Sequence, residues 1–301
     1  MPIEIPADAT VDTAITILLR ATRDHWAANE AVVAAGGSVE AVHQFRVGLR
    51  RFRSALSLFR AYLPEEQRRW ANDEAKWILS EFGPVRDLDV LAAELVPSVT
   101  KPKHRAAMRL LRASAQASRA AALTVARRAL ASSRYARFMR RLDTWLAGAG
   151  WRAARGPEVK DGSALPAADF ARRILNKRVL KVLARGKSLD EMSVDERHEI
   201  RIAIKKIRYG VEFFASILPR KRADALWQRL KALQDSLGHL NDVAVAEHTV
   251  ADLLGPPADQ IAAEKLALAG EELIAWHKRL EEAARPEAAK RWRDMRKAVL
   301  F

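Results

Sequence analysis

The sequence predicts an all-α fold made of two tandem, pseudo-symmetric helical bundles. Three observations carry this prediction. The chain of 301 residues is dominated by Ala, Leu, Arg and Glu, whereas β-branched and aromatic strand formers are sparse. Apolar residues recur at helical spacing in segments bounded by Gly and Pro. A pattern of basic and helix-breaking residues also occurs twice, which indicates an internal duplication.

About six helices are predicted in each half. In the first half they lie near Val11–Ala35, Val39–Leu63, Glu65–Phe82, Asp87–Val96, Lys103–Leu130 and Tyr135–Leu146. In the second half they lie near Ala167–Arg185, Val194–Leu218, Arg220–Leu237, Asp242–Leu253, Ala258–Glu282 and Glu287–Val299. The stretch from Gly148 to Pro166 is rich in Gly and Pro and has no apolar period. We therefore predict one domain whose halves, 1–149 and 165–301, are joined by a linker over 150–164.

The duplication keeps its register at an offset of 155 residues (198 − 43 = 155). At this offset His43 corresponds to His198, Arg46 to Arg201, Arg50 to Lys205, Arg51 to Lys206 and Arg53 to Arg208. The pairs Leu63-Pro64 and Leu218-Pro219 also correspond, and both are expected to end a helix because Pro cannot continue it. The same offset relates Gly83 to Gly238 and Asp87 to Asp242.

The formal net charge of +15 predicts a polyanionic partner. Nucleic acid, an anionic membrane surface and polyphosphate all fit this charge. The chain has no Cys, which excludes disulfides and thiolate metal sites. The first ten residues show no signal peptide, and no stretch approaches the roughly 18 uninterrupted apolar residues of a membrane span. We therefore expect a cytoplasmic protein.

The basic residues of each repeat form a stripe along one helix. His43, Arg46, Arg50 and Arg53 are spaced so that they share one face, at about 100° per residue. An adjoining apolar face is expected to contact the core. Few acids lie along the stripe to relieve the repulsion between its cations. Acids on neighbouring helices or a bound anion must therefore compensate, and Arg is well suited to a phosphate because its planar fork donates two hydrogen bonds.

A solvated basic helix face is the alternative explanation of a single stripe. Two matching copies, each with His and Arg, favour a binding surface. Further donors are predicted on the helix preceding each stripe, although a generic exposed charge explains each of them equally well. These additional candidates are Arg20, Arg23, Arg173 and Lys177, with Arg172 and Arg178 beside the last two on the same helix. We interpret Asp87 and Asp242 as acids at helix starts, with orientation of a neighbouring Arg or His as the less favoured role.

Catalytic and metal-binding patterns are weak. The chain has no Gly-x-x-x-x-Gly-Lys-Ser/Thr loop, no Gly-x-Gly-x-x-Gly motif and no nucleophile elbow. Glu40-x-x-His43 and Asp195-x-x-His198 have the spacing of di-iron helical bundles, but Arg follows each His three residues later. Cations beside a dication disfavour such a site. We therefore expect no metal, no cofactor and no enzymatic activity.

Several motifs resemble those of the conserved histidine α-helical domain, or CHAD, family. They are VHQFRVGLRRFRSAL, GPVRDLDV, SSRYARFMRRLDTWL, RHEIRIAIKKIRYGVEFF and LQDSLGHLNDVAV, and with the intervening helices they cover almost the whole chain. The resemblance implies two helical bundles about a pseudo-two-fold axis, with the stripes lining a central groove or pore. It also implies binding of inorganic polyphosphate and association with polyphosphate granules. The contacts that it implies are His43, Arg46, Arg50, Arg51, Arg53, His198, Arg201, Lys205, Lys206 and Arg208.

The chain departs from some members of that family. The Glu-x-Glu-x-Lys mark of a fused triphosphate tunnel domain is absent from this N-terminus, so no triphosphatase or cyclase activity is implied. The second repeat has Lys at two positions where the first has Arg, and Lys binds as a point charge. The expected partner is polyphosphate, or a phosphate or sulfate anion. The alternative is a nucleic acid bound by the same surface, although the stripes offer few base-stacking side chains.

Overall fold

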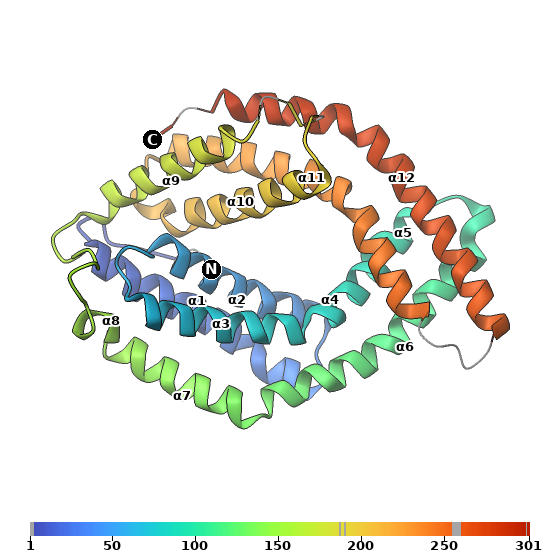
Figure 1. Cartoon of the computed structure of the whole chain (residues 1–301), viewed down its shortest axis with the longest axis horizontal. Coiled ribbons are helices and arrows are strands. Elements are labelled where there is room, and N and C mark those ends of the chain that lie inside the picture. Colours follow the sequence, from blue (N-terminus) through green and yellow to red (C-terminus); the bar gives the residue numbers. More distant parts are fainter. Residues whose placement is uncertain (1–2, 187, 190, 255–259, 299) are drawn as a thin grey trace.

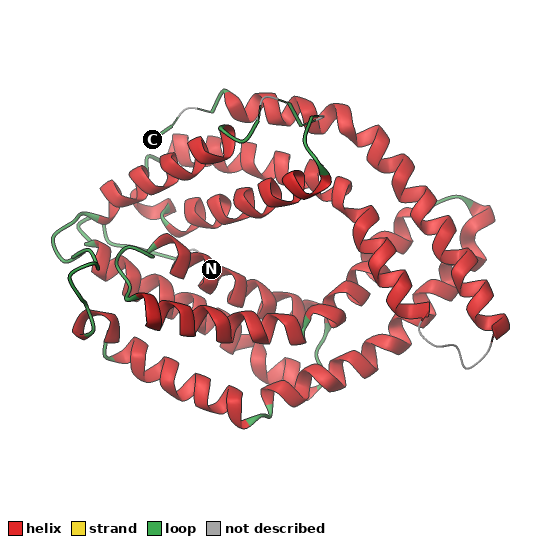
Figure 2. Cartoon of the chain, in the orientation of Figure 1, coloured by secondary structure: helices red, strands yellow, loops and turns green. Residues whose placement is uncertain are grey.

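The computed structural model describes residues 3–186, 188–189, 191–254, 260–298 and 300–301, and its regular elements are helices, which confirms the all-α prediction (Figure 2). The predicted first half contains α1 (Val11–Ala35), α2 (Val39–Leu58), α3 (Glu65–Glu81), α4 (Gly83–Val90), the π-helix η1 (Leu91–Leu95), α5 (Val96–Ser98), the 3-10 helix η2 (Pro102–His104), α6 (Arg105–Leu130) and α7 (Ser133–Ala147). The remainder contains α8 (Gly150–Ala153), α9 (Ala167–Leu183), α10 (Val194–Phe213), the 3-10 helix η3 (Ala215–Ile217), α11 (Arg220–Leu254) and α12 (Gln260–Arg296).

Side-chain caps fix the starts of α1, α2, α7 and α10. Thr10, Ser38 and Ser132 each accept a hydrogen bond from the backbone amide three residues later, at the starts of α1, α2 and α7. Ser193 and Glu196 form a capping box at the start of α10. These caps satisfy amides that have no partner inside the helix. The two helices that carry the basic stripes, α2 and α10, therefore begin at defined residues.

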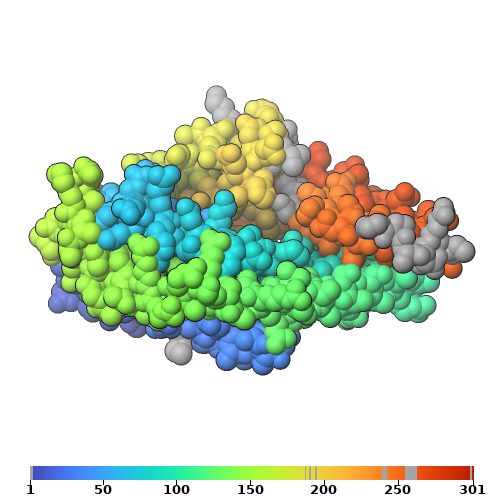
Figure 3. Space-filling view, turned by 60° about the horizontal axis from the view of Figure 1, so that its bottom comes forward, coloured from blue at the N-terminus to red at the C-terminus, as the bar shows by residue number. Residues whose placement is uncertain are grey.

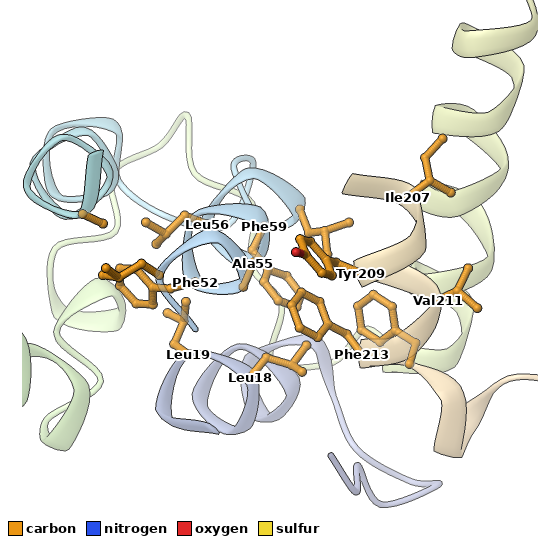
Figure 4. Packing of buried hydrophobic residues seen from close by; sticks show 14 of the residues in the cluster. Leu18, Leu19, Phe52, Ala55, Leu56, Phe59, Ile207, Tyr209, Val211 and Phe213 are labelled. Atoms are coloured by element: carbon orange, nitrogen blue, oxygen red, sulfur yellow. The ribbon is translucent and has the colours of Figure 1, made fainter. Parts of the chain in front are cut away.

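The main hydrophobic core includes residues from α1, α2, α3, α9, α10 and α11 (Figures 1 and 4). Phe59, just after α2, stacks on Phe170 of α9 with ring centroids 5.2 Å apart. The same ring meets Phe214, just after α10, edge-on at 6.1 Å. Such aromatic pairs add to the free energy gained by burial. The carboxyl ends of α2 and α10 are thus joined across the two predicted halves.

Gly210 of α10 packs against both α9 and α2. A Cβ added at this position would lie 2.8 Å from a terminal methyl of Leu175 on α9 and 3.7 Å from one of Leu58 on α2. The first distance would require the Leu175 side chain to shift, whereas the second is an ordinary van der Waals contact. A small residue therefore suits this packing of α10.

A second hydrophobic core lies at the other end of the molecule. It packs α4, η1, α5 and α6 against α11 and α12 through residues such as Leu91, Leu111, Ala246 and Leu273. Figure 1 shows these helices converging at the right-hand end, where the blue-to-green and orange-to-red parts of the chain meet. Each predicted half is therefore anchored to the other at both ends.

The predicted break between Leu237 and Asp242 is wrong, because α11 runs without interruption from Arg220 to Leu254. In the first half, Pro84 lies in the first turn of α4 and separates it from α3. The equivalent position, 239, holds a His, which keeps the backbone N–H that Pro lacks. The helix can therefore continue. The side chain of Asp242 lies outside the described residues.

The predicted break between Glu282 and Glu287 is also wrong, because α12 continues through Pro286. Pro286 is exposed, so water can reach the carbonyl that its missing N–H leaves without a helical partner. Beyond it, Ala288, Trp292 and Met295 are buried in the main core and hold the last turns in place. The predicted ends at Ala258 and Val299 lie outside the described residues.

The predicted linker contains the short helix α8 and is anchored at two points. Trp151 is fully buried and packs edge-on against Trp145 at 5.2 Å. Arg155 donates hydrogen bonds of 2.7 and 3.0 Å to the carboxylate of Asp12, which is only 4% exposed. A single buried tryptophan produces no apolar period in the sequence, so the pattern that predicted the linker gave no sign of this anchor.

We expect Pro286→Ala to stabilise the protein by about 1–3 kcal/mol, because Ala restores a helical hydrogen bond and removes a steric clash. The measurement is the free energy of unfolding from urea denaturation. Pro219→Ala is the matched control: Pro219 precedes α11, so its replacement should change stability by less than about 0.5 kcal/mol. Equal effects of the two substitutions would contradict this account of α12.

Candidate functional site

The two basic stripes lie on α2 and α10, which contact each other (Figure 1). On α2, Phe45, Leu49 and Phe52 are fully buried, whereas Arg46 and Arg50 are half-buried beside them. On α10, Ile200, Ile204 and Ile207 are buried in the same way. The amphipathic pattern thus directs the apolar side chains into the main core and leaves the cations along its margin.

Cations from both helices come together around Lys205. Burial, together with four nearby positive charges, lowers the pKa of Lys205 to about 7. In decreasing order of effect, these charges belong to Arg201, Arg50, Arg208 and Arg46. Two of them lie on α2 and two on α10. We call these five residues the central cationic cluster.

Neutral groups and a few acids contact the cluster. Arg46 donates a hydrogen bond of 2.5 Å to the backbone carbonyl of Leu79, and burial lowers its pKa to about 10. The Nε atoms of Arg50 and Arg208 are buried without a hydrogen-bond acceptor among the described residues. Glu212 lies 3.7 Å from Arg208. The cluster therefore retains donors and positive charge that the protein does not fully satisfy.

A smaller group of cations continues from the central cationic cluster. Lys206 is exposed over much of its surface. The burial of the remainder, together with the charges of Arg178 and Arg53, lowers its pKa. Arg53 donates a 3.0 Å hydrogen bond to the amide oxygen of Asn72, and Arg178 donates one of 3.1 Å to the hydroxyl of Ser57. Both arginines are thus oriented by uncharged acceptors and keep their positive charge available.

The two histidines of the repeat have different surroundings. His43 is half-buried; burial lowers its pKa, and the charges of Arg86 and Arg50 act in the same direction. His198 is exposed and lines a pocket of about 400 Å³ between α4, α10 and α11, together with Arg201 and Asp87. The internal repeat in the sequence therefore does not produce two identical sites.

Asp87 was interpreted as an acid at a helix start, but α4 begins four residues earlier, at Gly83. Its carboxylate instead lines the pocket beside His198. Burial raises the pKa of Asp87, and the charge of Arg46 opposes that increase. The less favoured role, that of an acid close to a stripe arginine, therefore fits the structure better.

Five other predicted residues lie away from the central cationic cluster or face different partners. Arg51 extends over the ring of Phe213, with its Cζ 5.3 Å from the ring centroid. Arg20 donates a 3.0 Å hydrogen bond to the carbonyl of Leu146, near the end of α7. Arg23 donates a 2.9 Å hydrogen bond to Asp143, also on α7. On α9, Arg173 and Lys177 are exposed.

The sequence singled out Arg178 only as one of four basic residues on its helix, and it gave no special weight to Arg86; both lie beside predicted site residues. Arg86 is close to His43 and forms a 2.6 Å ion pair with Glu94. Burial lowers the pKa of Arg178 to about 10. Both belong to basic segments noted in the sequence, but nothing in those segments separates a buried cation from an exposed one.

Within the described ranges, no group of three or more His, Asp or Glu is arranged to hold a metal ion. The same residues include no helix long and apolar enough to cross a membrane. What the site does present is closely spaced, half-buried positive charge on two packed helices. Such an arrangement attracts anions, and Arg and Lys donors can contact phosphate oxygens directly. The fold and the site together define an all-helical protein with a shared cationic cluster.

Comparisons with known proteins identify the family to which this chain belongs. The family model described as the CHAD domain matches residues 17–251, so the chain belongs to the CHAD family. The crystal structure of the CHAD domain from the plant Ricinus communis is similar, with 32% identity, a TM-score of 0.80, and coverage of 99% of this chain and 96% of that one. PptA from Streptomyces chartreusis shares the fold at 19% identity and a TM-score of 0.65, with 95% and 100% covered. A comparison with curated proteins found no match.

We expect the stability of the protein to rise between about pH 7 and 10 because of Lys205. Below pH 7 the folded state carries the full cost of its charge, whereas above it folded Lys205 loses the proton that the unfolded chain keeps up to about pH 10.4. Urea denaturation should show a gain of a few kcal/mol over this range relative to Lys205→Met. Lys181→Met, which removes an exposed lysine of α9, should keep the wild-type pH dependence.

Proposed function

We propose that the protein binds inorganic polyphosphate through the central cationic cluster and the stripes that meet there, and that it does so without catalysis. The observation that carries this proposal is the convergence of Arg46, Arg50, Arg201 and Arg208 on the half-buried Lys205. Like charges held this closely raise the energy of the folded state. A bound polyanion would lower that cost and could accept hydrogen bonds from the Nε donors of Arg50 and Arg208, which have no acceptor among the described residues.

A linear polyphosphate suits the extent of the site. Cations follow α2 from His43 to Arg53 and α10 from His198 to Arg208, and each unit of polyphosphate carries about one negative charge. A chain lying along a groove between these helices would contact several cations at once. A single phosphate or sulfate would contact fewer and should bind more weakly. Association with polyphosphate granules in the cytoplasm would follow from this affinity.

A nucleic acid bound by the same stripes is the alternative. It shares the phosphate chemistry but also needs side chains that contact bases. Two aromatic rings lie under arginines of the stripes, that of Tyr209 under Arg208 and that of Phe213 under Arg51. Both rings are at most 5% exposed and belong to the main core. No base can stack on them without unfolding α10. Polyphosphate, which has no bases, is therefore favoured at this site.

We expect Arg50→Ala combined with Lys205→Met to weaken the binding of long-chain polyphosphate about a hundredfold. One charge is removed from each helix, and a hydrogen bond to a charged group contributes roughly 1.5–3 kcal/mol. A filter-retention assay measures the affinity. The slope of log affinity against log salt should also fall by about 1.5, because two fewer counterions are released.

The matched control for this pair is Arg109→Ala with Arg112→Ala, which removes two exposed charges from α6. It should reduce affinity by less than about threefold, as expected for screened surface charges. Arg119 is unsuitable as a control because it forms an ion pair with the buried Asp89. Equal losses from the two double variants would show that net charge alone drives binding and would overturn the proposed site.

We also expect polyphosphate binding to take up protons at about pH 8, because a bound anion raises the low pKa of Lys205. Isothermal titration calorimetry in buffers of different ionisation enthalpy measures this uptake. Lys205→Arg should abolish most of it, since Arg is charged throughout this range. Undiminished proton uptake by Lys205→Arg would mean that another group meets the anion.

A further inference from the structure

A hollow of about 700 Å³ lies between α3 and α7, on a surface that the polyphosphate site does not use. Its walls come from α3, α7 and α8. The residues that line it are Gln67, Trp70, Arg137, Arg140, Arg141, Thr144, Trp145 and Gly150. On α7, Arg137, Arg140, Arg141 and Thr144 follow at helical spacing and therefore share one face. Figure 3 shows the side of the molecule along which α7, in green, lies in front.

The floor of the hollow is aromatic and fixed in place. Trp145 is 7% exposed and donates a 2.7 Å hydrogen bond to Gln67. The ring of Trp70 meets that of Trp145 edge-on, with centroids 6.2 Å apart. The guanidinium of Arg141 lies over the Trp70 ring, with its Cζ 4.1 Å from the centroid. This stack presents a flat, positively charged plate that is already organised.

The rim of the hollow carries positive charge. Arg137, Arg140 and Arg141 are exposed, and none of them forms an ion pair with an acid in the described part of the chain. The neighbouring acids are already engaged: Asp143 pairs with Arg23, and Glu74 pairs with Arg134. Three cations therefore surround two tryptophans without a matching negative charge.

The geometry of α3 separates this hollow from the central cationic cluster. Asn72 and Leu79 of α3 accept hydrogen bonds from the stripe arginines of α2. Trp70 lies two residues from Asn72, which places it about 200° away around the helix. The hollow and the polyphosphate site are thus on opposite faces of α3. Substitutions in one site therefore do not change residues that line the other.

We propose that this hollow binds single-stranded nucleic acid. Arginine guanidinium planes and aromatic rings are the platforms on which unpaired bases stack, and the surrounding arginines supply donors for the phosphates. Polyphosphate has no flat ring and would leave the guanidinium plate of Arg141, which lies over Trp70, unused as a stacking platform. A duplex hides its base faces within the stack. This inference stands independently of the polyphosphate proposal because it rests on different residues.

Fluorescence anisotropy with a labelled single-stranded oligonucleotide tests the proposal at low and moderate salt. Arg137→Ala with Arg140→Ala should weaken oligonucleotide binding at least about tenfold, because two phosphate contacts are lost, and should leave polyphosphate affinity within about twofold. Arg50→Ala with Lys205→Met should show the reverse pattern. An abasic strand of the same length should bind at least about fivefold more weakly than the normal strand, because stacking is lost.

Arg141→Ala removes the guanidinium plate and leaves both tryptophans. It should reduce the difference in affinity between the normal and the abasic strand. Thermal unfolding by circular dichroism confirms that each variant is folded, and the substitutions at Arg137, Arg140 and Arg141 replace exposed side chains of α7. The proposal is overturned if the wild type does not bind the oligonucleotide at low salt, or if the stripe variant loses that binding and the α7 variant keeps it. Equal binding of the normal and abasic strands would overturn the stacking role and leave attraction by charge alone.

Discussion

The repulsion between cations on α2 and α10 is the constraint around which the site is organised. The contact of Phe59 with Phe214 brings the carboxyl ends of the two helices together. Because the basic stripes adjoin the buried faces of these helices, core packing forces their charges into one region. The burial that stabilises the fold thus also creates the local excess of positive charge, and this excess is the basis of the proposed affinity for polyphosphate.

The way the protein orients these cations follows from the same constraint. Arg46, Arg53 and Arg178 donate to a backbone carbonyl, an amide oxygen and a hydroxyl, respectively. A carboxylate at each position would hold the side chain equally well but would neutralise it. Neutral acceptors fix the direction of a guanidinium and keep its charge for a ligand. By contrast, Arg23 and Arg134 pair with carboxylates on the outer surface, where no such preservation is needed.

The sequence was sufficient to predict most helices of the first half and the correspondence of the two stripes, because these depend on periodicity and on an exact offset. The contact between the stripe-bearing helices was implied only by the family resemblance. The sequence wrongly predicted helix breaks at 237–242 and 282–287. In the first case the second repeat lacks the Pro that separates α3 from α4, and in the second the core packing of the last turns keeps α12 continuous through Pro286. It also could not distinguish Arg20, which caps α7, from Arg50, which lies in the cluster. Both are arginines on amphipathic helices, and only the fold determines which neighbours they meet. Asp87 was undervalued for the same reason.

The replacement of Arg by Lys in the second repeat acquires a physical meaning in this setting. An Arg at 205 would remain charged beside Arg46, Arg50, Arg201 and Arg208, and the free protein would bear the full repulsion. Lys205, whose pKa burial and these neighbours lower to about 7, can release its proton when no anion is present. In the proposed function, a bound polyanion would raise this pKa again, so that Lys205 would regain its proton and its positive charge. Duplication therefore supplied two copies of the stripe. Their divergence at position 205, where Lys replaces the Arg of the first copy, lowers the repulsion between the two stripes in the free protein.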